Sequence, residues 1–326
     1  MCTAISWKAD SHYFGRNLDL EGSYGEYIAV VPRNMPLRFH SGEISNVHYA
    51  LIGTAHVSGD YPLFYDAVNE NGVCFAGLNF PGNACYEGGD ESIACYEIAL
   101  YLLAKCRTAR EACDLLAEKG ISGAAFREDM PATPLHFMIA DEKDCFVIEP
   151  MKGGIRIHQN PLGVLTNNPP FEFQMMNLNN YLNLTTKEPE NRFSSEAGLK
   201  AYSRGMGAMG LPGDFSSQSR FVKAAFVKYN SPVSESAEEN IMQFFHMLDS
   251  VAMPMGSVVL ENGALDRTIY SCCFDADKGV YYYKTYENSL LHAVDMHLED
   301  IDSDKLTAYP MEHRLNIIMQ NNNPRA

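Results

Sequence analysis

The residue with the clearest capacity for chemistry stands at the start of the chain, which reads MCTAIS. Methionine aminopeptidases remove Met1 when the next side chain is small, so routine processing would leave Cys2 as the first residue. The pKa of an unperturbed cysteine thiol is about 8.5 and that of an α-amine is about 8, so the freed amine can take the thiol proton near neutral pH. An N-terminal cysteine thus carries its own base. The same hexapeptide would arise if position 2 merely tolerated any small residue. Other segments of the chain are needed to distinguish this interpretation from a catalytic cysteine.

The segment FGRNLDL holds two charged side chains that could serve such a thiol. Arg16 and Asp19 lie three residues apart, on opposite faces of a fully extended strand but on one side if the strand bends near Gly15. A carboxylate near an α-amine would orient it. A surface ion pair would show the same spacing.

Asparagines stand where two predicted strands end, Asn79 in GLNFPG and Asn167 with Asn168 in VLTNNPPF. Asparagine at such places usually serves the turn, but its side-chain amide can also donate to a developing oxyanion. Arg220, in SSQSRF, falls in the first turn of a predicted helix, where the helix dipole disfavours a cation. Either another group holds Arg220 there or the side chain is solvated.

Composition indicates a globular protein that does not bind nucleic acid. The 326 residues are 46% hydrophobic and carry a formal charge of −16, from 41 acidic and 25 basic residues. Such a charge repels polyanions, so local arginines must capture any anionic substrate. No linker divides the chain, and we expect one domain over residues 1–326. No apolar run approaches the ~18 residues of a membrane-spanning helix.

The cysteines indicate a reduced, cytoplasmic protein. There are nine, without a C-x-x-C pair or an apolar signal segment. Cys95, Cys106, Cys113 and the adjacent Cys272 and Cys273 fit core positions better than metal ligands or disulfides. We therefore expect no metal and no cofactor.

The pattern of apolar residues predicts an α+β fold with antiparallel sheets. Short strands bounded by Gly, Asn or Pro fill the first third and return over residues 134–168, and another follows at 279–288. Helices are predicted over 91–106, 108–120, 216–230 and 236–251. Thr108 with Glu111, and Ser236 with Glu239, have the spacing of a capping box. The polar tail NNNPRA is expected to be disordered.

Seven segments, taken together and in order, resemble the choloylglycine hydrolase family, and within it the bacterial conjugated bile salt hydrolases. They are MCTAI, FGRNLDL, DYPLFYDAVNENG, AGLNFPG, VLTNNPPFEFQ, RGMGAMGLPGDFSSQSRF and KGVYYYKTYEN. The resemblance implies the N-terminal nucleophile hydrolase fold, a four-layer αββα sandwich. It also implies hydrolysis of the amide bond in glycine- or taurine-conjugated bile salts. Penicillin V acylase is the nearest alternative enzyme, and a non-catalytic steroid-binding protein is the alternative of another class.

The resemblance also assigns roles to the polar residues. Cys2 matches the nucleophile, and its freed amine would be the base. Asp19 would hold that amine, while Arg16 and Arg220 would lie close to the nucleophile. Asn79 and Asn167 would donate to the oxyanion. Asparagine at position 79 favours bile salts over penicillin V, since the acylases often have tyrosine there. Pro170 departs from the threonine that is common in the family.

A steroid would need an apolar pocket, for which the family comparison suggests Leu18, Leu20, Tyr24, Phe64 and the stretch from Phe126 to Leu135. The same side chains would also suit a core. Arg204, in YSRGMG, is a candidate reader of the glycine carboxylate or taurine sulfonate. A thioester on Cys2 would allow transfer to other amines as a side activity. The resemblance further implies a homo-oligomer, commonly a tetramer.

Overall fold

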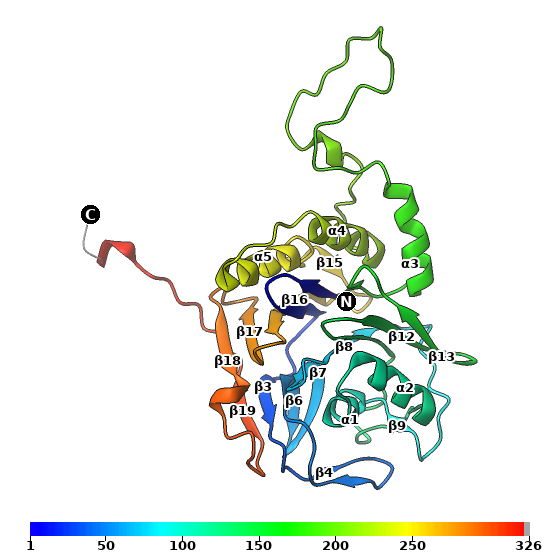
Figure 1. Ribbon diagram of the computed structural model, residues 1–326, viewed down its shortest axis with the longest axis vertical. Coiled ribbons are helices and arrows are strands. Elements are labelled where there is room, and N and C mark those ends of the chain that lie inside the picture. Colours follow the sequence, from blue (N-terminus) through cyan, green and yellow to red (C-terminus); the bar gives the residue numbers. More distant parts are fainter. Residues whose placement is uncertain (323–326) are drawn as a thin grey trace.

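The computed structural model describes residues 1–322, and these form two large antiparallel sheets packed face to face between helices (Figure 1). Helices α4 and α5 cover the outer face of one sheet, and α1 and α2 cover the outer face of the other. The predicted order of layers, αββα, and the predicted antiparallel pairing of the main sheets are confirmed. Of the predicted disordered tail, Asn321 and Asn322 belong to a short 3₁₀ turn, and residues 323–326 lie outside the described residues.

The first sheet contains the N-terminus of the chain. Its strands, in spatial order, are β14 (Val164–Leu165), β1 (Cys2–Lys8), β2 (His12–Leu20), β16 (Leu265–Asp275), β17 (Val280–Thr285) and β18 (His292–Asp295), with β15 (Val258–Val259) paired to β16. Gly15 is required where β2 meets β16, since a Cβ there would lie 1.9 Å from the carbonyl oxygen of Cys272. Only glycine therefore fits at this position, where β2 lies between β1 and β16.

In the second sheet, neighbouring antiparallel strands follow the order of the sequence, and the C-terminal strand is added at one edge. Its strands, in spatial order, are β13 (Gly154–Gln159), β12 (Cys145–Met151), β11 (Leu135–Ala140), β8 (Cys74–Asn79), β7 (Tyr61–Asn69), β6 (Leu51–Ser58), β3 (Glu26–Val31) and β19 (Thr307–Pro310). Two small pairs stand apart, β4 (Leu37–Arg38) with β5 (Ile44–Ser45), and the parallel pair β9 (Ile93–Ala94) with β10 (Ile121–Ser122).

Three of the predicted helices form nearly as expected. They are α2 (Ala109–Lys119), α4 (Ser217–Tyr229) and α5 (Ala237–Asp249). The hydroxyl of Thr108 accepts from the N–H of Glu111 at 3.1 Å, and Ser236 caps α5 in the same way, so both capping predictions are confirmed. Gly120 ends α2 with a φ of 72°.

The helices differ from the prediction in two places. Helix α1 spans only Ile98–Lys105, because residues 93–94 form strand β9 and residues 95–97 form a turn. The carboxylate of Glu97 holds this turn by accepting from the N–H groups of Ala94 and His40. Helix α3 (Phe171–Asn177) was not predicted. It begins directly after Pro170, a residue that fits the start of a helix because it has no N–H to leave unpaired.

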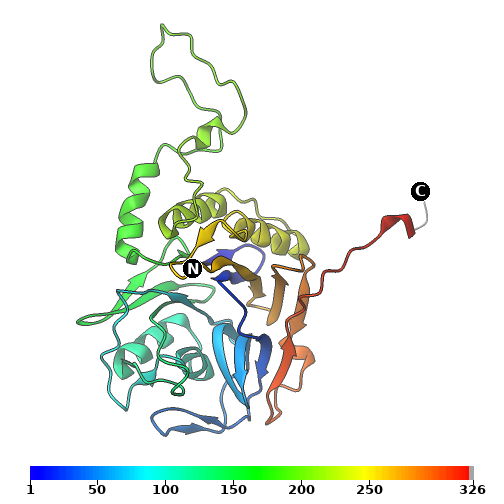
Figure 2. The ribbon, with the colours of Figure 1, turned by 180° about the vertical axis from the view of Figure 1, so that it is seen from behind.

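Two apolar clusters fill the layers. The inner core lies between the two sheets and under α4 and α5, and includes Cys2, Phe14, Phe244 and Tyr281. The outer core lies between the second sheet and α1 and α2, and includes Phe137, Leu102 and Leu116. Most of the segment between α3 and α4, residues 178–216, forms an arm that extends away from both cores (Figures 1 and 2). No helix within residues 1–322 is long and apolar enough to cross a membrane.

Candidate active site

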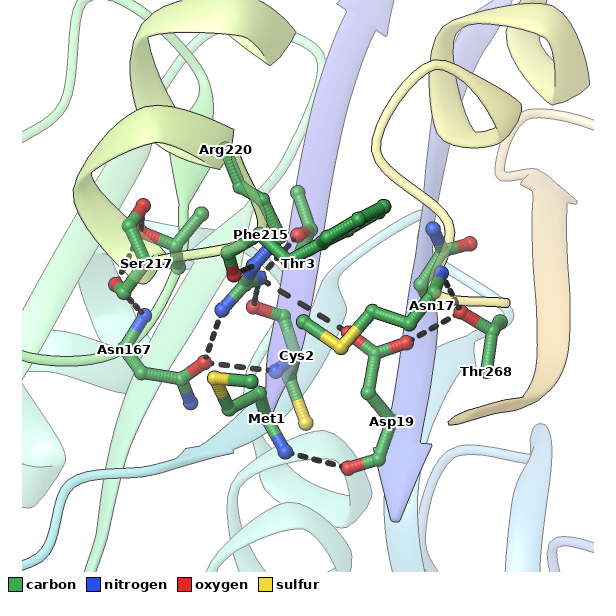
Figure 3. A network of polar contacts seen from close by, with 12 residues as sticks. Met1, Cys2, Thr3, Asn17, Asp19, Asn167, Phe215, Ser217, Arg220 and Thr268 are labelled. Atoms are coloured by element: carbon green, nitrogen blue, oxygen red, sulfur yellow. Dashed lines mark hydrogen bonds and ion pairs between the residues drawn. The ribbon is translucent and has the colours of Figure 1, made fainter. Parts of the chain in front are cut away.

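Cys2 begins β1, lies in the inner core and is 3% exposed. Its backbone N–H donates to Oδ1 of Asn167 at 2.7 Å, and its carbonyl accepts from Nη1 of Arg220 at 2.5 Å (Figure 3). The Cα of Cys2 faces that of Leu18 on β2. The two backbone polar groups of Cys2 are therefore held by side chains from two other segments, which fixes the orientation of the residue.

Asn167 connects three segments of the site. Its backbone N–H donates to the hydroxyl of Ser217, at the start of α4, at 2.8 Å. Its Nδ2 donates to the backbone carbonyl of Asn79, at the end of β8, at 2.7 Å. The two asparagines predicted from their strand ends are thus in direct contact. The side chain of Asn79 is half-buried and forms no hydrogen bond within residues 1–322, which leaves its amide available to a ligand.

Arg220 lies in the first turn of α4 and is 1% exposed. Its Nη1 donates to the hydroxyl of Thr3 at 2.6 Å, its Nη2 donates to Oδ1 of Asn167 at 2.9 Å, and its Nε donates to the carbonyl of Phe215. Burial lowers the pKa of Arg220, and the carboxylate of Asp19 only partly offsets this effect. These contacts account for a cation at a helix start, and the solvated alternative is wrong.

Asp19 approaches the same guanidinium from β2. Its Oδ2 lies 3.9 Å from Nη1 of Arg220, and its Oδ1 accepts from the hydroxyl of Thr268 at 2.6 Å. Oδ2 forms no hydrogen bond within residues 1–322. Burial raises the pKa of Asp19, although Arg220 and the chain's α-amine oppose this. The site therefore contains a buried carboxylate with one oxygen still available.

Arg16 lies on the opposite face of β2 from Asp19, so the strand is extended and does not bend at Gly15. The side chain is fully buried and crosses to the second sheet, where Nη1 donates to the carbonyls of Gly77 at 2.6 Å and Tyr65 at 3.2 Å. Burial works to lower the pKa of Arg16, but Cys2, Tyr270 and Asp66 raise it above its ordinary value. A cation therefore stands near Cys2 on the inner side.

Met1 precedes Cys2 in the structure, so the nitrogen of Cys2 is a peptide nitrogen. The α-amine of Met1 donates to the carbonyl of Asp19 at 2.5 Å and lies 3.3 Å from Oδ2 of Asp266. Asp266 and Thr268, both on β16, were not singled out from the sequence. The only sequence signal for them is that Asp266 and Thr268 stand two residues apart in LDRTIY and so share one face of a strand. Polar residues with this spacing ordinarily indicate a solvated face.

The model of the choloylglycine hydrolase family, a group of linear amide C–N hydrolases, matches residues 2–309. This chain belongs to that family. The resemblance inferred from the seven sequence segments is confirmed.

Relatives in this family match almost the whole chain. The "Bile salt hydrolase/transferase" of Lactiplantibacillus plantarum is 45% identical over 95% of this chain and 97% of its own length. A variant of the conjugated bile acid hydrolase from Clostridium perfringens has a similar crystal structure, with a TM-score of 0.90 at 34% identity over 97% of this chain and 99% of that one. Penicillin V acylase from Agrobacterium tumefaciens has a TM-score of 0.74 at 21% identity, over 94% and 90% of the two chains, which shows a shared fold alone.

The residues suggested as a steroid pocket are divided between the two cores. Leu18 and Leu20 pack in the inner core with Cys2, whereas Phe64 and Leu135 pack against the outer core. Leu135 nevertheless pairs with Asn79 across β11 and β8.

The other two suggested pocket residues lie in loops. The ring of Phe126 packs on Tyr61, with centroids 5.5 Å apart. Tyr24 is 59% exposed, and its carbonyl accepts from His56.

Arg204 is not brought to the site. It is an exposed residue of the arm, beyond a neck at which the N–H of Thr185 donates to the carbonyl of Gly207. The arm extends away from the N-terminus of its own chain (Figures 1 and 2).

Within the described residues, no group of three or more His, Cys, Asp or Glu side chains could hold a metal ion.

Proposed function

We propose that this protein hydrolyses the amide bond of bile salts conjugated to glycine or taurine, releasing the free bile acid and the amino acid. The relatives that match it at 45% and 36% identity are both named bile salt hydrolase/transferase. The observation that carries the proposal is the setting of Cys2, a buried residue whose nitrogen is held by Asn167 and whose surroundings contain Arg16, Asp19 and Arg220.

Removal of Met1 is the first requirement, since it converts the peptide nitrogen of Cys2 into an α-amine. Oδ1 of Asn167 already accepts from this nitrogen at 2.7 Å, so the amine would be oriented as soon as it is formed. Asp19, with one carboxylate oxygen unpartnered within residues 1–322, would hold the protonated amine. Thiol and base would then belong to one fixed residue.

In the acylation step, the sulfur of Cys2 attacks the amide carbonyl carbon, and its proton passes to the α-amine. The carbonyl oxygen becomes an oxyanion, which the side-chain amides of Asn79 and Asn167 would stabilise by donating hydrogen bonds. The C–N bond then breaks as the amine returns the proton to the leaving nitrogen of glycine or taurine. The bile acid remains on Cys2 as a thioester.

In the second step, water attacks the thioester carbon and gives its proton to the same α-amine. The C–S bond breaks, the thiol is restored and the bile acid leaves. Another amine that attacked in place of water would give a new bile acid amide, and we propose this transfer as a side activity of the same intermediate.

The steroid would contact Leu18, Leu20, Tyr24, Phe64 and the stretch from Phe126 to Leu135. This proposal is supported by Leu135, which pairs directly with Asn79, and by the aromatic packing around Phe126. Arg204 stays a proposed reader of the acidic end of the conjugate. Since its arm leads away from its own Cys2, Arg204 would have to act in an oligomer.

We also propose that the protein forms a homo-oligomer in the cytoplasm, with a tetramer implied by the family resemblance alone. The arm carries strongly exposed apolar side chains, among them Leu182 at 83%, Phe193 at 89% and Tyr202 at 82%. A monomer rarely leaves such side chains in water over one extended segment. An oligomer would cover them.

The test is release of glycine and taurine from glycocholate and taurocholate by protein whose mass shows Met1 removed, with penicillin V as a parallel substrate. We expect release from the bile salts with little cleavage of penicillin V. The opposite preference would make the protein a penicillin V acylase. Binding of bile salt without release, by this protein and by Cys2→Ala alike, would support a steroid-binding protein. Excess amino acid in the same assay would reveal transfer as a new amide.

A further inference from the structure

The two segments that carry Asn79 and Asn167 are joined by more than the contact between those residues. Nδ2 of Asn168 donates to the carbonyl of Pro81 at 2.8 Å, and Nδ2 of Asn83 donates to Oδ1 of Asn168 at 2.7 Å. The turn after β8 and the loop before α3 therefore form one hydrogen-bonded unit. Its geometry sets the spacing between the proposed oxyanion donors.

His136, on β11, lies against both halves of this unit and is fully buried. Its ring stacks on that of Phe80, the residue after Asn79, with centroids 4.2 Å apart and an interplanar angle of 5°. Its Nε2–H donates to the carbonyl of Thr166, the residue before Asn167, at 2.8 Å. One side chain thus contacts the immediate neighbour of each asparagine.

Glu149, on β12, holds His136 from the other side and is also fully buried. Its Oε1 lies 3.4 Å from Nδ1 of His136 and accepts from the N–H of Phe171 at 2.8 Å. The pair therefore binds the loop at both ends, through Thr166 and through Phe171. His158, on β13, lies 3.5 Å from Oε2 of Glu149.

A buried histidine and glutamate are costly in a core, where an aromatic and an aliphatic side chain would fill the same volume. Their contacts converge on the loop that carries Asn167 and on the residue that follows Asn79. Oxyanion donors act only when they are held within about 0.5 Å of the productive geometry. Filling of the core therefore does not by itself explain why His136 and Glu149 make these contacts.

We propose that His136 and Glu149 are positioning residues, which fix the distance between Asn79 and Asn167 and so keep both amides directed at the oxyanion. The inference rests on the proposed function, because it assigns a purpose to donors within that reaction. His136 and Glu149 do not touch the substrate. They act through the backbone at Thr166 and Phe171 and through the ring of Phe80.

The test compares His136→Phe, which keeps the ring on Phe80 but removes the donor, with His136→Gln, whose side-chain amide can still donate to Thr166. We expect kcat to fall about 10- to 100-fold in His136→Phe with KM changed less than about twofold. In His136→Gln, kcat should be at least about fivefold higher than in His136→Phe. Alkylation of Cys2 by iodoacetamide involves no oxyanion, so its rate should stay within about threefold of the parent.

His48→Phe is the matched control. His48 is likewise buried, with both ring nitrogens bonded to backbone carbonyls, but those belong to Met35 and Tyr49. We expect this variant to lose stability and keep kcat. If His136→Phe does not fold, Glu149→Gln is used instead, with an expected three- to tenfold loss of kcat at constant KM.

The inference is overturned if kcat stays within twofold of the parent in the folded His136→Phe or Glu149→Gln protein. It is also overturned if alkylation of Cys2 falls in parallel with kcat, or if His136→Gln is no better than His136→Phe. An inactive parent protein, by contrast, would contradict the proposed function itself. The two failures are therefore distinguishable in one set of assays.

Discussion

The inner and outer cores bury polar side chains in different ways. Around the outer core such side chains bond mainly to the backbone. Nδ2 of Asn69, for example, donates to the carbonyls of Leu103 and Cys106 at the end of α1. Around the inner core, charged side chains approach one another and Cys2, the proposed nucleophile, as Arg220 does with the carboxylate of Asp19 and the backbone carbonyl of Cys2.

We infer from this difference that the polar side chains of the outer core serve the fold, whereas the charged side chains of the inner core serve the proposed reaction. A backbone carbonyl at a helix end must find a donor, and Asn69 supplies one at little electrostatic cost. A buried ion pair adds little net stability, since desolvation opposes the attraction between the charges. Net stability therefore does not explain the charges of the inner core, whereas their proposed roles in the reaction would.

The largest expected difference between the two cores is in kcat after replacement of one cysteine in each. Cys2→Ser should lower kcat by at least about 1,000-fold, because a hydroxyl is a much weaker nucleophile near neutral pH. Cys113 lies in the outer core, and burial raises its pKa to about 12. Cys113→Ser should keep kcat within about twofold. Release of amino acid from glycocholate by both variants measures this, and a large loss in Cys113→Ser would contradict the division between the cores.

A polar substitution in each core should separate activity from stability. Asp19→Asn keeps the shape and an acceptor for Thr268 but removes the charge beside Arg220. We expect kcat/KM to fall about 100-fold, with a change of less than about 2 kcal/mol in the free energy of unfolding. Urea denaturation and steady-state kinetics on the same preparation measure both quantities.

Asn69→Leu is the counterpart in the outer core. It leaves the carbonyls of Leu103 and Cys106 without their donor, and we expect a loss of about 2–4 kcal/mol in the free energy of unfolding. The kcat of the folded protein should be unchanged. A loss of activity here without a loss of stability would contradict the comparison.

The smallest expected effect is a dependence of stability on pH from His12, on β2. Burial lowers the pKa of His12 to about 4, although Asp277 opposes this. The unfolded chain therefore takes up the proton near pH 6.5, whereas the folded protein takes it up only near pH 4. Stability should rise with pH across this window, by about 2–3 kcal/mol.

Urea denaturation at pH 4.5 and pH 7 measures this contribution of His12. His12→Gln, which can still bond to Ser6, should show a smaller difference in the free energy of unfolding between the two values than the parent. An equal difference in the two proteins would remove His12 as the source.

Local signals in the sequence were sufficient for the capped helices. Thr108 with Glu111, and Ser236 with Glu239, satisfy the first N–H groups of α2 and α5 from within four residues. Local signals were insufficient for α1, whose predicted first turns are replaced by β9 and a turn at Glu97. The partner of Glu97 at His40 is more than fifty residues away along the chain, and no local pattern contains it.

The sequence by itself determined four of the candidate site residues, since Cys2, Asp19, Asn167 and Arg220 were named from it and lie together in the structure. These residue types belong to segments whose order the family resemblance made specific. Only the tertiary structure decided how they meet. It placed Arg16 and Asp19 on opposite faces of one strand, added Asp266 and Thr268, and directed the arm with Arg204 away from the site. Such contacts join positions up to 265 residues apart, and they are set by how sheets and helices pack, which no short stretch of sequence encodes.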